Sequence, residues 1–400
     1  MTKRLSTRAV RAGINCDSAF GAIVPPLVLS ANFSFDGFGG KREYDYTRSS
    51  NPTRDQLGDA LASLEGGAGA VVTATGMGAV TLVLNALLRP GSRLLVPHDC
   101  YGGSWRLFRV LAEKGAFELD SCDFTSASAV SEAMAGKPDL VWLETPSNPL
   151  LRITDLRAAA AAAHAAGALV VADNTFLSPA LQRPLEHGAD VVIHSTTKYI
   201  NGHSDVVGGA AIAADPAVLD QLAWWANALG LTGSPFDSFM TLRGLRTLDA
   251  RLRIQEANCS AIAQLLAADP HVAAVHYPGL PTHPGHLVAA RQQDGFGAML
   301  SFEFYGAEDA ARAFVNGLTC ITLAESLGGV ESLIAHPASM SHAVLSDDER
   351  SRAGIGPGLL RLSVGIEHLD DLLPDIQAGL ARVARCSPRE ASAELLASQG

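Results

Sequence analysis

Short apolar runs alternate with helix-like stretches from about residue 69 to residue 215. These runs are bounded by turn-forming residues and have the length of strands that are buried on both faces. We predict strands over residues 70–73, 93–97, 140–144, 168–173, 190–195 and 208–213, and helices over residues 77–88, 103–113 and 155–166. The pattern is typical of an α/β unit in which helices cover a parallel sheet, with functional residues at the carboxyl ends of the strands.

The chain is too long to form a single hydrophobic core. It has 400 residues, 48% of them hydrophobic, and chains of this length usually divide into domains. Residues 15–60 contain turn formers and aromatic residues without a sustained period, a helical stretch covers residues 222–248, and weaker strand patterns occur at 272–277 and 298–304. We predict an N-terminal arm (1–55) that contacts a neighbouring subunit, a large domain (56–248), a smaller C-terminal α/β domain (249–386) and a flexible tail (387–400).

Charge and hydropathy exclude several classes of function. The formal net charge is −11, and no cluster of Lys and Arg stands out, so nucleic acid is not an expected partner. The most apolar long segment, 158–171, is interrupted by His164 and Gly167, and the opening residues lack the apolar core of a secretory signal. We therefore expect a soluble, cytoplasmic protein that does not enter the membrane.

Cysteine and histidine spacing predicts neither disulfides nor a metal site. The six cysteines are scattered without C-x-x-C spacing, which indicates free thiols in a long chain without a secretory signal. His283 and His286 have the spacing of a metal-ligand pair. No acidic or thiolate residue accompanies them at ligand spacing, so we predict a polar loop and no bound metal.

The segment HSTTKYINGHSD, residues 194–205, follows directly on a predicted strand. It places the amine of Lys198 beside the hydroxyl groups of Ser195, Thr196 and Thr197. An amine at a strand end can bond the aldehyde of a pyridoxal cofactor, and neighbouring hydroxyls can bind its phosphate. Taken alone, the segment leaves open that Lys198 is a solvated surface residue.

Two further segments carry groups that such a cofactor requires. Asp173 ends the predicted strand 168–173, where a carboxylate can keep a cofactor ring nitrogen protonated. The glycine turn TGMGA (75–79) precedes a predicted helix, whose first amides and dipole favour a phosphate. Simpler interpretations are a turn or N-cap aspartate and a plain tight turn. A dinucleotide fold lacks support because the third glycine of its motif is absent.

These segments occur in the order found in fold-type I pyridoxal enzymes, and the chain resembles the Cys/Met-metabolism family that depends on pyridoxal 5′-phosphate. The resemblance covers residues 7–385. The matching stretches are YDYTRSSNPTRD (44–55), LEGGAGAVVTATGMGA (64–79), PHDCYGGSWRLF (97–108), LETPSNPLLRITDL (143–156), VADNTFLSPALQ (171–182), HSTTKYINGHSDVVGG (194–209), WWANALGLTG (224–233), LAESLGGVESLI (323–334) and RLSVGIEHLDDL (361–372). It implies a fold-type I transferase with a large, mixed but mostly parallel sheet domain and a smaller C-terminal α/β domain.

The resemblance also implies a cofactor site. Lys198 is expected to bond the cofactor and move protons, Tyr101 to stack on its ring, and Asp173 to face its ring nitrogen, which makes these the catalytic residues. The phosphate is expected to be bound by Gly76, Met77, Ser195 and Thr197, with Tyr46 and Arg48 supplied by a neighbouring subunit. Such sharing implies a homotetramer assembled from two active dimers.

Further residues are implied to bind the substrate. Arg361 is expected to hold its α-carboxylate, because a guanidinium meets a carboxylate through two parallel bonds. Asn148 is expected to orient Arg361 or contact the cofactor's ring oxygen, and Ser326 to steady the catalytic lysine. The residues expected to select the second substrate or leaving group are Glu325, Arg106 and Asn227.

The implied substrates are small amino acids, and the implied reaction is a γ-replacement that forms cystathionine from an O-acylhomoserine and cysteine in methionine biosynthesis. The acyl group, succinyl or acetyl, stays open, because family members that use a succinyl ester can have an arginine where this chain has Ser49. The alternative is a γ-lyase that cleaves cystathionine to cysteine, ammonia and 2-oxobutanoate. Stretches 100–108, 224–227 and 323–334 favour γ-replacement. A non-catalytic scaffold is expected to lack Lys198 or Arg361, and both are present.

Overall fold

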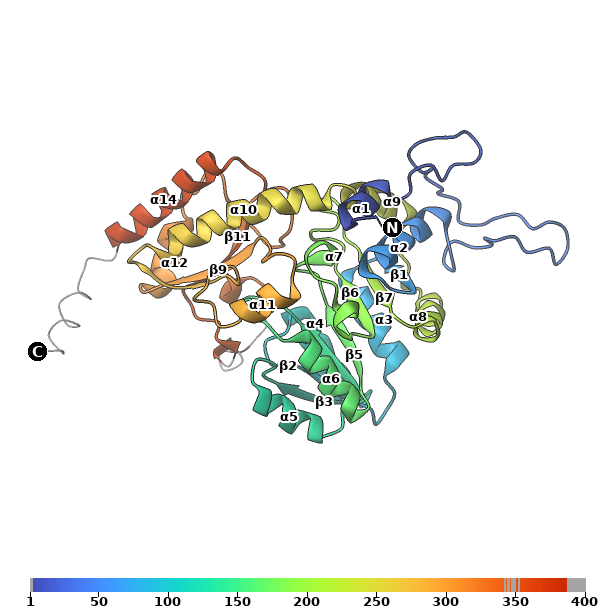
Figure 1. Cartoon of the computed structure of the whole chain (residues 1–400), viewed down its shortest axis with the longest axis horizontal. Coiled ribbons are helices and arrows are strands. Elements are labelled where there is room, and N and C mark those ends of the chain that lie inside the picture. The colour runs from blue at the N-terminus through green and yellow to red at the C-terminus, as the bar shows by residue number, and fades with distance from the viewer. Residues whose placement is uncertain (1–2, 342, 344–345, 347–349, 352, 387–400) are drawn as a thin grey trace, which may run out of the picture.

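Two sheets organise the chain. The computed structural model describes residues 3–386 apart from residues 342, 344–345, 347–349 and 352. Each sheet has helices packed against it, and a long loop near the N-terminus projects from the body of the molecule (Figure 1). The predicted tail at 387–400 lies outside the described residues, and the predicted domain boundaries stay predictions.

The larger sheet has seven strands in the order β1-β7-β6-β5-β4-β2-β3. Neighbouring strands are parallel except at β7, which runs antiparallel to β1 and β6. The strands are β1 (Gly69–Thr73), β2 (Arg93–Pro97), β3 (Glu118–Cys122), β4 (Leu140–Glu144), β5 (Leu169–Asp173), β6 (Val191–His194) and β7 (Gly209–Ala213). All the strands predicted in this region are confirmed, and the sheet is mixed but mostly parallel.

The sequence pattern did not predict β3. This strand lies at the edge of the sheet and pairs with β2 alone. Its sequence, ELDSC, contains no continuous apolar run, and Glu118, Asp120 and Ser121 are exposed. An edge strand does not need the apolar run that marks a strand buried on both faces, so its pattern resembles that of a loop.

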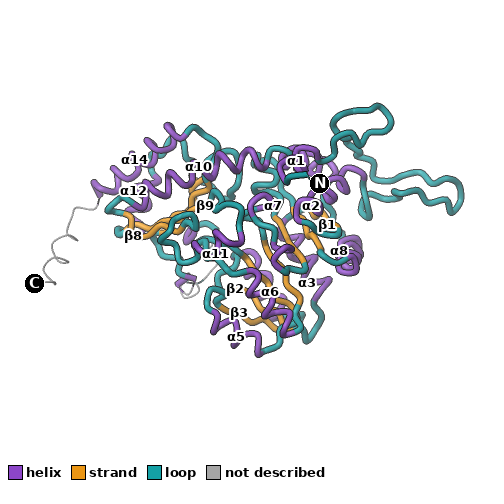
Figure 2. Tube along the Cα trace, in the orientation of Figure 1, coloured by secondary structure: helices purple, strands orange, loops and turns teal. Residues whose placement is uncertain are grey.

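Helices cover both faces of the larger sheet (Figures 1 and 2). Val171 packs in a core with α3, α4 and α8, whereas its neighbours Val170 and Ala172 pack with α5 and α6 on the opposite face. This alternation is the two-residue period of a strand. The helices of this region are α2 (Pro52–Glu65), α3 (Gly76–Leu87), α4 (Gly102–Glu113), α5 (Ala127–Ala135), α6 (Leu156–Ala166), α7 (Ser178–Leu181), the 3₁₀ helix η1 (Pro184–His187) and α8 (Pro216–Leu229).

The smaller sheet has five strands in the order β10-β11-β12-β9-β8. The strands are β8 (Val272–His276), β9 (Met299–Phe304), β10 (Thr322–Leu323), β11 (Leu333–Ala335) and β12 (Leu359–Ser363). The helices around it are α10 (Leu248–Ala267), α11 (His286–Gln292), α12 (Ala307–Val315), the 3₁₀ helix η2 (Pro337–Ser339) and α14 (Leu369–Cys386). β8 and β9 confirm the two strands predicted in this half of the chain.

The single helical stretch predicted over residues 222–248 is wrong. α8 ends at Leu229, a separate helix α9 covers Pro235–Leu245, and α10 begins at Leu248. Gly230 ends α8 in the left-handed conformation, with φ +71°. The side chain of Ser234 accepts the backbone N–H of Asp237, which caps the start of α9. These local capping signals interrupt a sequence that is apolar enough to continue as one helix.

The N-terminal arm joins α1 (Leu5–Arg11) to α2. Residues 12–51 are all described and contain no helix or strand beyond a bridge between Asn32 and Tyr46. The aperiodic region predicted over residues 15–60 is wrong from Pro52 onward. The Asn51 side chain accepts the N–H groups of the second and third residues of α2, and Pro52 occupies its first position, so the helix starts there.

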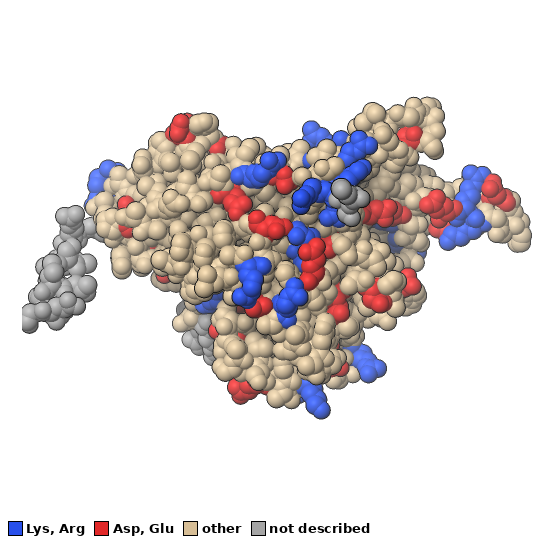
Figure 3. Space-filling view, viewed as in Figure 1, with Lys and Arg blue, Asp and Glu red and all other residues tan. Residues whose placement is uncertain are grey.

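Two further features are the charge of the surface and the apolar character of the helices. Basic and acidic side chains lie intermixed on the face drawn in Figure 3. Among the residues that the structure describes, none of the helices combines the length and the apolar character needed to span a bilayer.

Candidate active site

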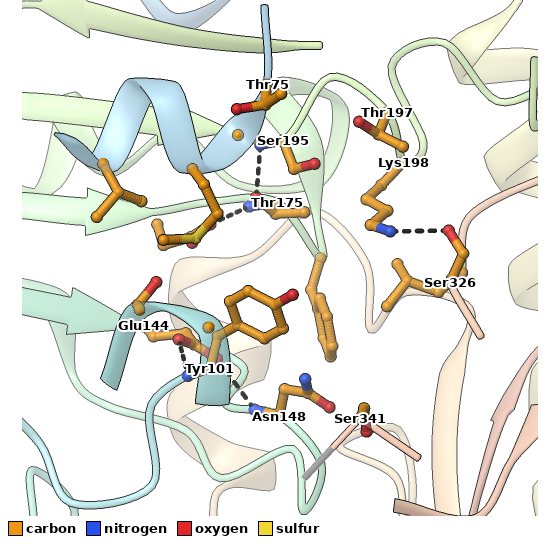
Figure 4. A pocket seen from close by; sticks show the side chains of 18 of the residues that line it. Thr75, Tyr101, Glu144, Asn148, Thr175, Ser195, Thr197, Lys198, Ser326 and Ser341 are labelled. Carbon is orange, nitrogen blue, oxygen red and sulfur yellow. Dashed lines mark hydrogen bonds between the residues drawn. The ribbon is translucent and has the colours of Figure 1, made fainter. Parts of the chain in front are cut away.

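A cavity of about 550 Å³ lies at the carboxyl ends of the parallel strands. Its wall combines residues that follow β1, β4, β5 and β6 with residues of the smaller sheet's loops and β12. Figure 4 shows side chains from both units pointing into it. Carboxyl ends of parallel strands are the usual position of a ligand site in an α/β fold.

Lys198 reaches the cavity from the loop after β6. Its Nζ donates a 2.7 Å hydrogen bond to Oγ of Ser326 (Figure 4). Burial lowers the pKa of Lys198 to about 8; the positive charge of Arg361 lowers it further and Glu325 opposes both effects. Lys198 is therefore a half-buried amine with an accessible neutral form, and not a solvated surface residue.

Asp173 ends β5 and lines the same cavity. One carboxylate oxygen accepts the backbone N–H of Thr175 at 3.0 Å. Burial raises the pKa of Asp173, while its bonds to Thr175 and the nearby His194 favour the ionised form. His194 is itself fully buried and paired with Glu65 at 2.6 Å. His194 therefore lies near Asp173 while it is hydrogen-bonded to a fully buried carboxylate, Glu65.

The N-terminus of α3 forms one end of the cavity. The side chain of Thr75 accepts the N–H of Gly78 and caps the helix. Gly76 and Met77, the first two residues of α3, line the cavity, and the first N–H groups of a helix have no partner within it. A Cβ on Gly76 would lie 2.8 Å from Cβ of Ser195. The close approach of these two backbones makes a small cradle at a helix N-terminus, which suits a phosphate.

Hydroxyl groups surround this cradle. Thr175 Oγ1 accepts the N–H of Ser195 at 2.9 Å (Figure 4). Oγ1 of Thr197 donates to the carbonyl of Gly208 at 3.2 Å. Ser195, Thr197 and Thr175 all line the cavity. The cradle can therefore offer an anion both amide and hydroxyl donors.

Tyr101 immediately precedes α4, and its ring lies in the cavity (Figure 4). A Cβ on Gly103 would meet the tyrosine ring at 2.5 Å, so the glycine leaves room for this ring position. Burial raises the pKa of Tyr101, which keeps the phenol neutral. The neutral ring offers a flat apolar surface that a heteroaromatic ring can stack on.

Arg361 lies in β12 and is only 3% exposed. Its Nη1 donates to Oδ1 of Asn148 at 2.9 Å, and its Nη2 donates to the backbone carbonyl of Ser326 at 3.0 Å. Its Nε is buried and, within the described residues, has no hydrogen-bond partner. Burial lowers the pKa of Arg361 to about 10, so the group stays cationic at neutral pH and carries a buried donor for an anionic ligand.

The remaining predicted site residues fall into two groups. Arg106 and Glu325 line the cavity. The charge of Arg106 lowers the pKa of Tyr101, and that of Glu325 raises it. Three residues lie away from the cavity wall of the single chain: Tyr46, Arg48 and Asn227. Nη1 of Arg48 donates to the backbone carbonyl and to Oδ1 of Asn227 at 2.7 and 2.8 Å, and its guanidinium lies 5.7 Å from the Tyr46 ring.

The sequence reasoning missed Glu144 and Thr175. Glu144 ends β4 and its carboxylate is part of the cavity wall. The signal that could have found it is the one that identified Asp173, a carboxylate at the end of a buried parallel strand. Thr175 follows Asp173 by two residues, in a turn sequence that gives no signal of a site residue.

His283 and His286, whose spacing is that of a metal-ligand pair, make local hydrogen bonds. His286 Nδ1 bonds to the carbonyl of Pro278, and His283 Nδ1 accepts the N–H of Gly285. Over the described part of the chain, no group of three or more His, Cys, Asp or Glu could hold a metal ion. All six cysteines are free.

Pyridoxal 5′-phosphate fits the residues of this cavity. The cavity has a half-buried amine with a lowered pKa, a half-buried carboxylate at the end of the neighbouring strand, and a cradle between Gly76 and Ser195 that a methyl group would fill. A mostly parallel sheet with helices on both faces, a lysine after one of its strands and a phosphate seat at a helix N-terminus define a pyridoxal enzyme of fold type I.

The comparisons with known proteins agree with this class. The chain belongs to the family of Cys/Met metabolism PLP-dependent enzymes, whose model matches residues 6–381. It is 53% identical to the cystathionine gamma-synthase of Escherichia coli K12 over 95% of this chain and 98% of that protein. A cystathionine gamma-lyase of Dictyostelium discoideum is 42% identical over 94% of this chain and 97% of that protein.

The structural comparison gives the same family. The crystal structure of a cystathionine gamma synthase from Xanthomonas oryzae pv. oryzae in complex with cystathionine has a TM-score of 0.96 and 66% sequence identity. The match covers 97% of this chain and 100% of that one. The fold-type I architecture and the pyridoxal cofactor implied by the sequence resemblance are therefore confirmed.

Proposed function

We propose that this chain joins an O-acylhomoserine to cysteine, forming cystathionine and releasing the carboxylic acid, as a step in methionine biosynthesis. The observation that carries the proposal is one cavity holding both a half-buried amine, Lys198, and a buried guanidinium, Arg361, with Ser326 bonded to each. This pair suits an amino-acid substrate whose α-carbon must lose a proton. The synthase relatives and the cystathionine complex of the Xanthomonas enzyme support the choice of substrates.

The lining of the cavity supports the choice of cofactor residues. Lys198 would hold the aldehyde of the cofactor, Asp173 would keep its ring nitrogen protonated, and Tyr101 would support its ring. The groups that hold the phosphate are Gly76, Met77, Ser195 and Thr197. When bound, pyridoxal phosphate withdraws electrons from the carbon atoms of the attached amino acid and so makes their protons removable. A buried acid at the ring nitrogen supports this withdrawal because it retains a proton there.

Arg361 holds the substrate's α-carboxylate in this proposal. Asn148 and the Ser326 carbonyl fix the plane of the guanidinium, since each accepts one of its N–H groups. A fixed guanidinium orients the α-carbon toward the amine of Lys198. Once the substrate's amino group has displaced it, the free amine of Lys198 would remove protons from Cα and Cβ of the homoserine unit and later return them, because its lowered pKa gives it a neutral form near physiological pH.

The second half of the reaction concerns Cγ. The bond from Cγ to the acyl oxygen breaks and the acid leaves as its carboxylate. Cysteine loses its thiol proton to solvent, and the resulting thiolate sulfur forms a new bond to Cγ. Glu325 receives the amino group of the incoming cysteine. Arg106 and Asn227 select the second substrate or the leaving group. Glu325 and Arg106 support these roles by their position in the cavity wall.

The N-terminal arm supplies the neighbouring site in this proposal. Tyr46 and Arg48 bind the phosphate of an adjacent subunit, which makes the active unit a dimer and the assembly a homotetramer. The arm supports this because large apolar side chains on it are exposed in the single chain, among them Phe20 and Phe38 at 92% and 111%. Such side chains favour burial against another chain. Six free cysteines suit the reducing cytoplasm.

Product analysis of the purified holoenzyme tests the proposal. One mixture contains cysteine with O-succinylhomoserine or, separately, O-acetylhomoserine, and the other contains cystathionine alone. Accumulation of cystathionine in the first mixture, with slow cleavage in the second, is the expected result, and the faster ester identifies the acyl group. Rapid conversion of cystathionine to cysteine, ammonia and 2-oxobutanoate would instead assign the chain as a γ-lyase.

A further inference from the structure

Glu144 is a buried carboxylate to which the proposed reaction assigns no role. It is the last residue of β4, is 7% exposed and contributes to the cavity wall. Its Oε2 accepts the backbone N–H of Tyr101 at 2.8 Å, and its Oε1 accepts the backbone N–H of Asn148 at 3.2 Å. Figure 4 shows the carboxylate lying between these two residues.

The two amides belong to two different loops that each carry a site side chain. Tyr101 lies between β2 and α4 and is the N-cap residue of α4. Its side chain makes no capping hydrogen bond to that helix. Asn148 lies in the loop after β4, and its Oδ1 accepts Nη1 of Arg361. One carboxylate therefore connects the residue beneath the proposed cofactor ring with the residue that holds the proposed substrate clamp.

The surroundings make this carboxylate costly to bury. Glu144 is paired in register with Asp173 of the neighbouring strand. Burial raises the pKa of Glu144 well above its ordinary value, the charges of Asp173 and Asp99 raise it further, and the two amide donors oppose these effects. An apolar residue at this position would avoid the cost of burying a carboxylate. What the carboxylate provides in return is an acceptor for two backbone N–H groups.

We propose that Glu144 is a positioning residue that sets the Tyr101 ring and the Asn148–Arg361 pair relative to each other. The proposal rests on the function proposed above for Tyr101 and Arg361. Glu144 contacts backbone groups of these loops, so it acts on the cofactor and the substrate through Tyr101 and Asn148. Loss of Glu144 therefore weakens the binding of the cofactor and of the substrate. A general loss of protein stability would not change these two affinities.

The Glu144→Gln variant separates the two acceptors. A carboxyl group accepts at both oxygens, and it still does so when protonated because a hydroxyl oxygen keeps a lone pair. A glutamine of the same shape has one oxygen and an NH₂ group that cannot accept. Either the Tyr101 or the Asn148 amide therefore loses its partner, whatever the protonation state of the native side chain.

The primary measurement is binding of pyridoxal phosphate to the apoprotein, followed by equilibrium dialysis and by circular dichroism of the cofactor band. For Glu144→Gln we expect the dissociation constant of the cofactor, or the KM for the O-acylhomoserine, to rise about tenfold. The first result marks loss of the Tyr101 contact and the second marks loss of the Asn148 contact. We expect the cofactor dichroism to change when the Tyr101 contact is lost.

Asp375→Asn is the matched control. Asp375 is buried to a similar extent, at 6%, and its carboxylate accepts the backbone N–H groups of Cys320 at 2.9 Å and Ile321 at 3.1 Å. None of these three residues lines the cavity. We expect this variant to lower the melting temperature of the apoprotein while leaving the cofactor dissociation constant and KM as in the wild type.

Two outcomes overturn the proposal. One is a Glu144→Gln protein that is less stable than the wild type but has the same cofactor affinity and KM. The other applies if that variant does not fold: Glu144→Asp, whose shorter carboxylate cannot reach both amides, then takes its place, and unchanged binding by it contradicts the proposal. If the wild type lacks γ-replacement activity, only the proposed function fails, because cofactor affinity still tests Glu144.

Discussion

Nζ of Lys198 lies 2.7 Å from Oγ of Ser326, although 128 residues separate the two in the chain. Ser326 has a positive φ of 83°, a conformation that non-glycine residues seldom adopt. Its backbone carbonyl at the same time accepts Nη2 of Arg361. One residue in an unusual backbone conformation thus links the larger sheet's amine to the smaller sheet's guanidinium.

The Ser326→Ala variant removes the hydroxyl and keeps the carbonyl that Arg361 uses. We expect kcat for cystathionine formation to fall about tenfold, because the amine of Lys198 loses its hydrogen-bond partner. Steady-state kinetics with both substrates varied measure this change. Cofactor content, read from absorbance, is expected to equal that of the wild type, and an unchanged kcat contradicts the role given to this hydroxyl.

The pKa of Lys198 sets the pH range in which apoprotein takes up the cofactor. Burial lowers this pKa to about 8, so the amine is protonated and unreactive below that pH and neutral above it. We expect the rate of covalent attachment of pyridoxal phosphate to rise with pH and to level off above about 8, as followed by stopped-flow absorbance. In Glu325→Gln the midpoint is expected to move to lower pH, since Glu325 favours the charged amine. A midpoint near the ordinary lysine value of 10.5 contradicts the prediction.

Arg361→Lys keeps the positive charge but loses the planar set of donors. We expect KM for the O-acylhomoserine to rise roughly 10- to 100-fold, because a lysine cannot donate to Asn148, to the Ser326 carbonyl and to a carboxylate in the same geometry. Kinetics at saturating cysteine provide the measurement. Cofactor affinity serves as the internal control and is expected to stay unchanged, and a KM equal to that of the wild type removes Arg361 from the substrate site.

Gly76→Ala fills the phosphate cradle. The added Cβ would lie 2.8 Å from Cβ of Ser195, so the N-terminus of α3 and the segment after β6 must separate. We expect the dissociation constant of pyridoxal phosphate to increase about tenfold or more, as measured by dialysis of the apoprotein. Gly356→Ala is the matched control, since its Cβ would meet no atom closer than 3.6 Å. Equal cofactor affinity in both variants argues against a phosphate at this cradle.

Mixing two variants, each impaired at a different part of the site, tests the role of the arm. Lys198→Ala removes the amine of its own site, and Arg48→Ala is expected to weaken the phosphate site of the adjacent subunit. If subunits are exchanged by unfolding and refolding the two proteins together, some sites receive a native Lys198 and a native Arg48 from different chains. We expect activity to return in the mixture and not in either protein refolded alone. No recovery, with mixed dimers demonstrated by tag capture, excludes a shared site.

Local pattern predicted most of the larger sheet. The strands from β4 to β6 are apolar runs buried on both faces, and such runs stand out because neither face can be polar. The edge strand β3 lacked this pattern. The antiparallel direction of β7 could not be predicted either, because strand direction depends on the path of the connecting chain and not on side-chain periodicity.

The candidate site likewise contains residues that the local sequence predicted and residues that it did not. The sequence by itself determined the groups that stand at strand ends or helix starts: Lys198 after β6, Asp173 at the end of β5 and the glycine turn before α3. Each is defined by a few neighbouring residues, so the local sequence is sufficient to predict it, and the family resemblance added Arg361 and Ser326 by position.

Only the tertiary structure decided how these groups meet. It brought Ser326 against Lys198 and placed Glu144 between the amides of Tyr101 and Asn148. It also turned Arg48 of the single chain toward Asn227, away from the cavity wall. These contacts join segments far apart in sequence, and they depend on how two sheets and their loops pack. No local pattern of residues carries that information.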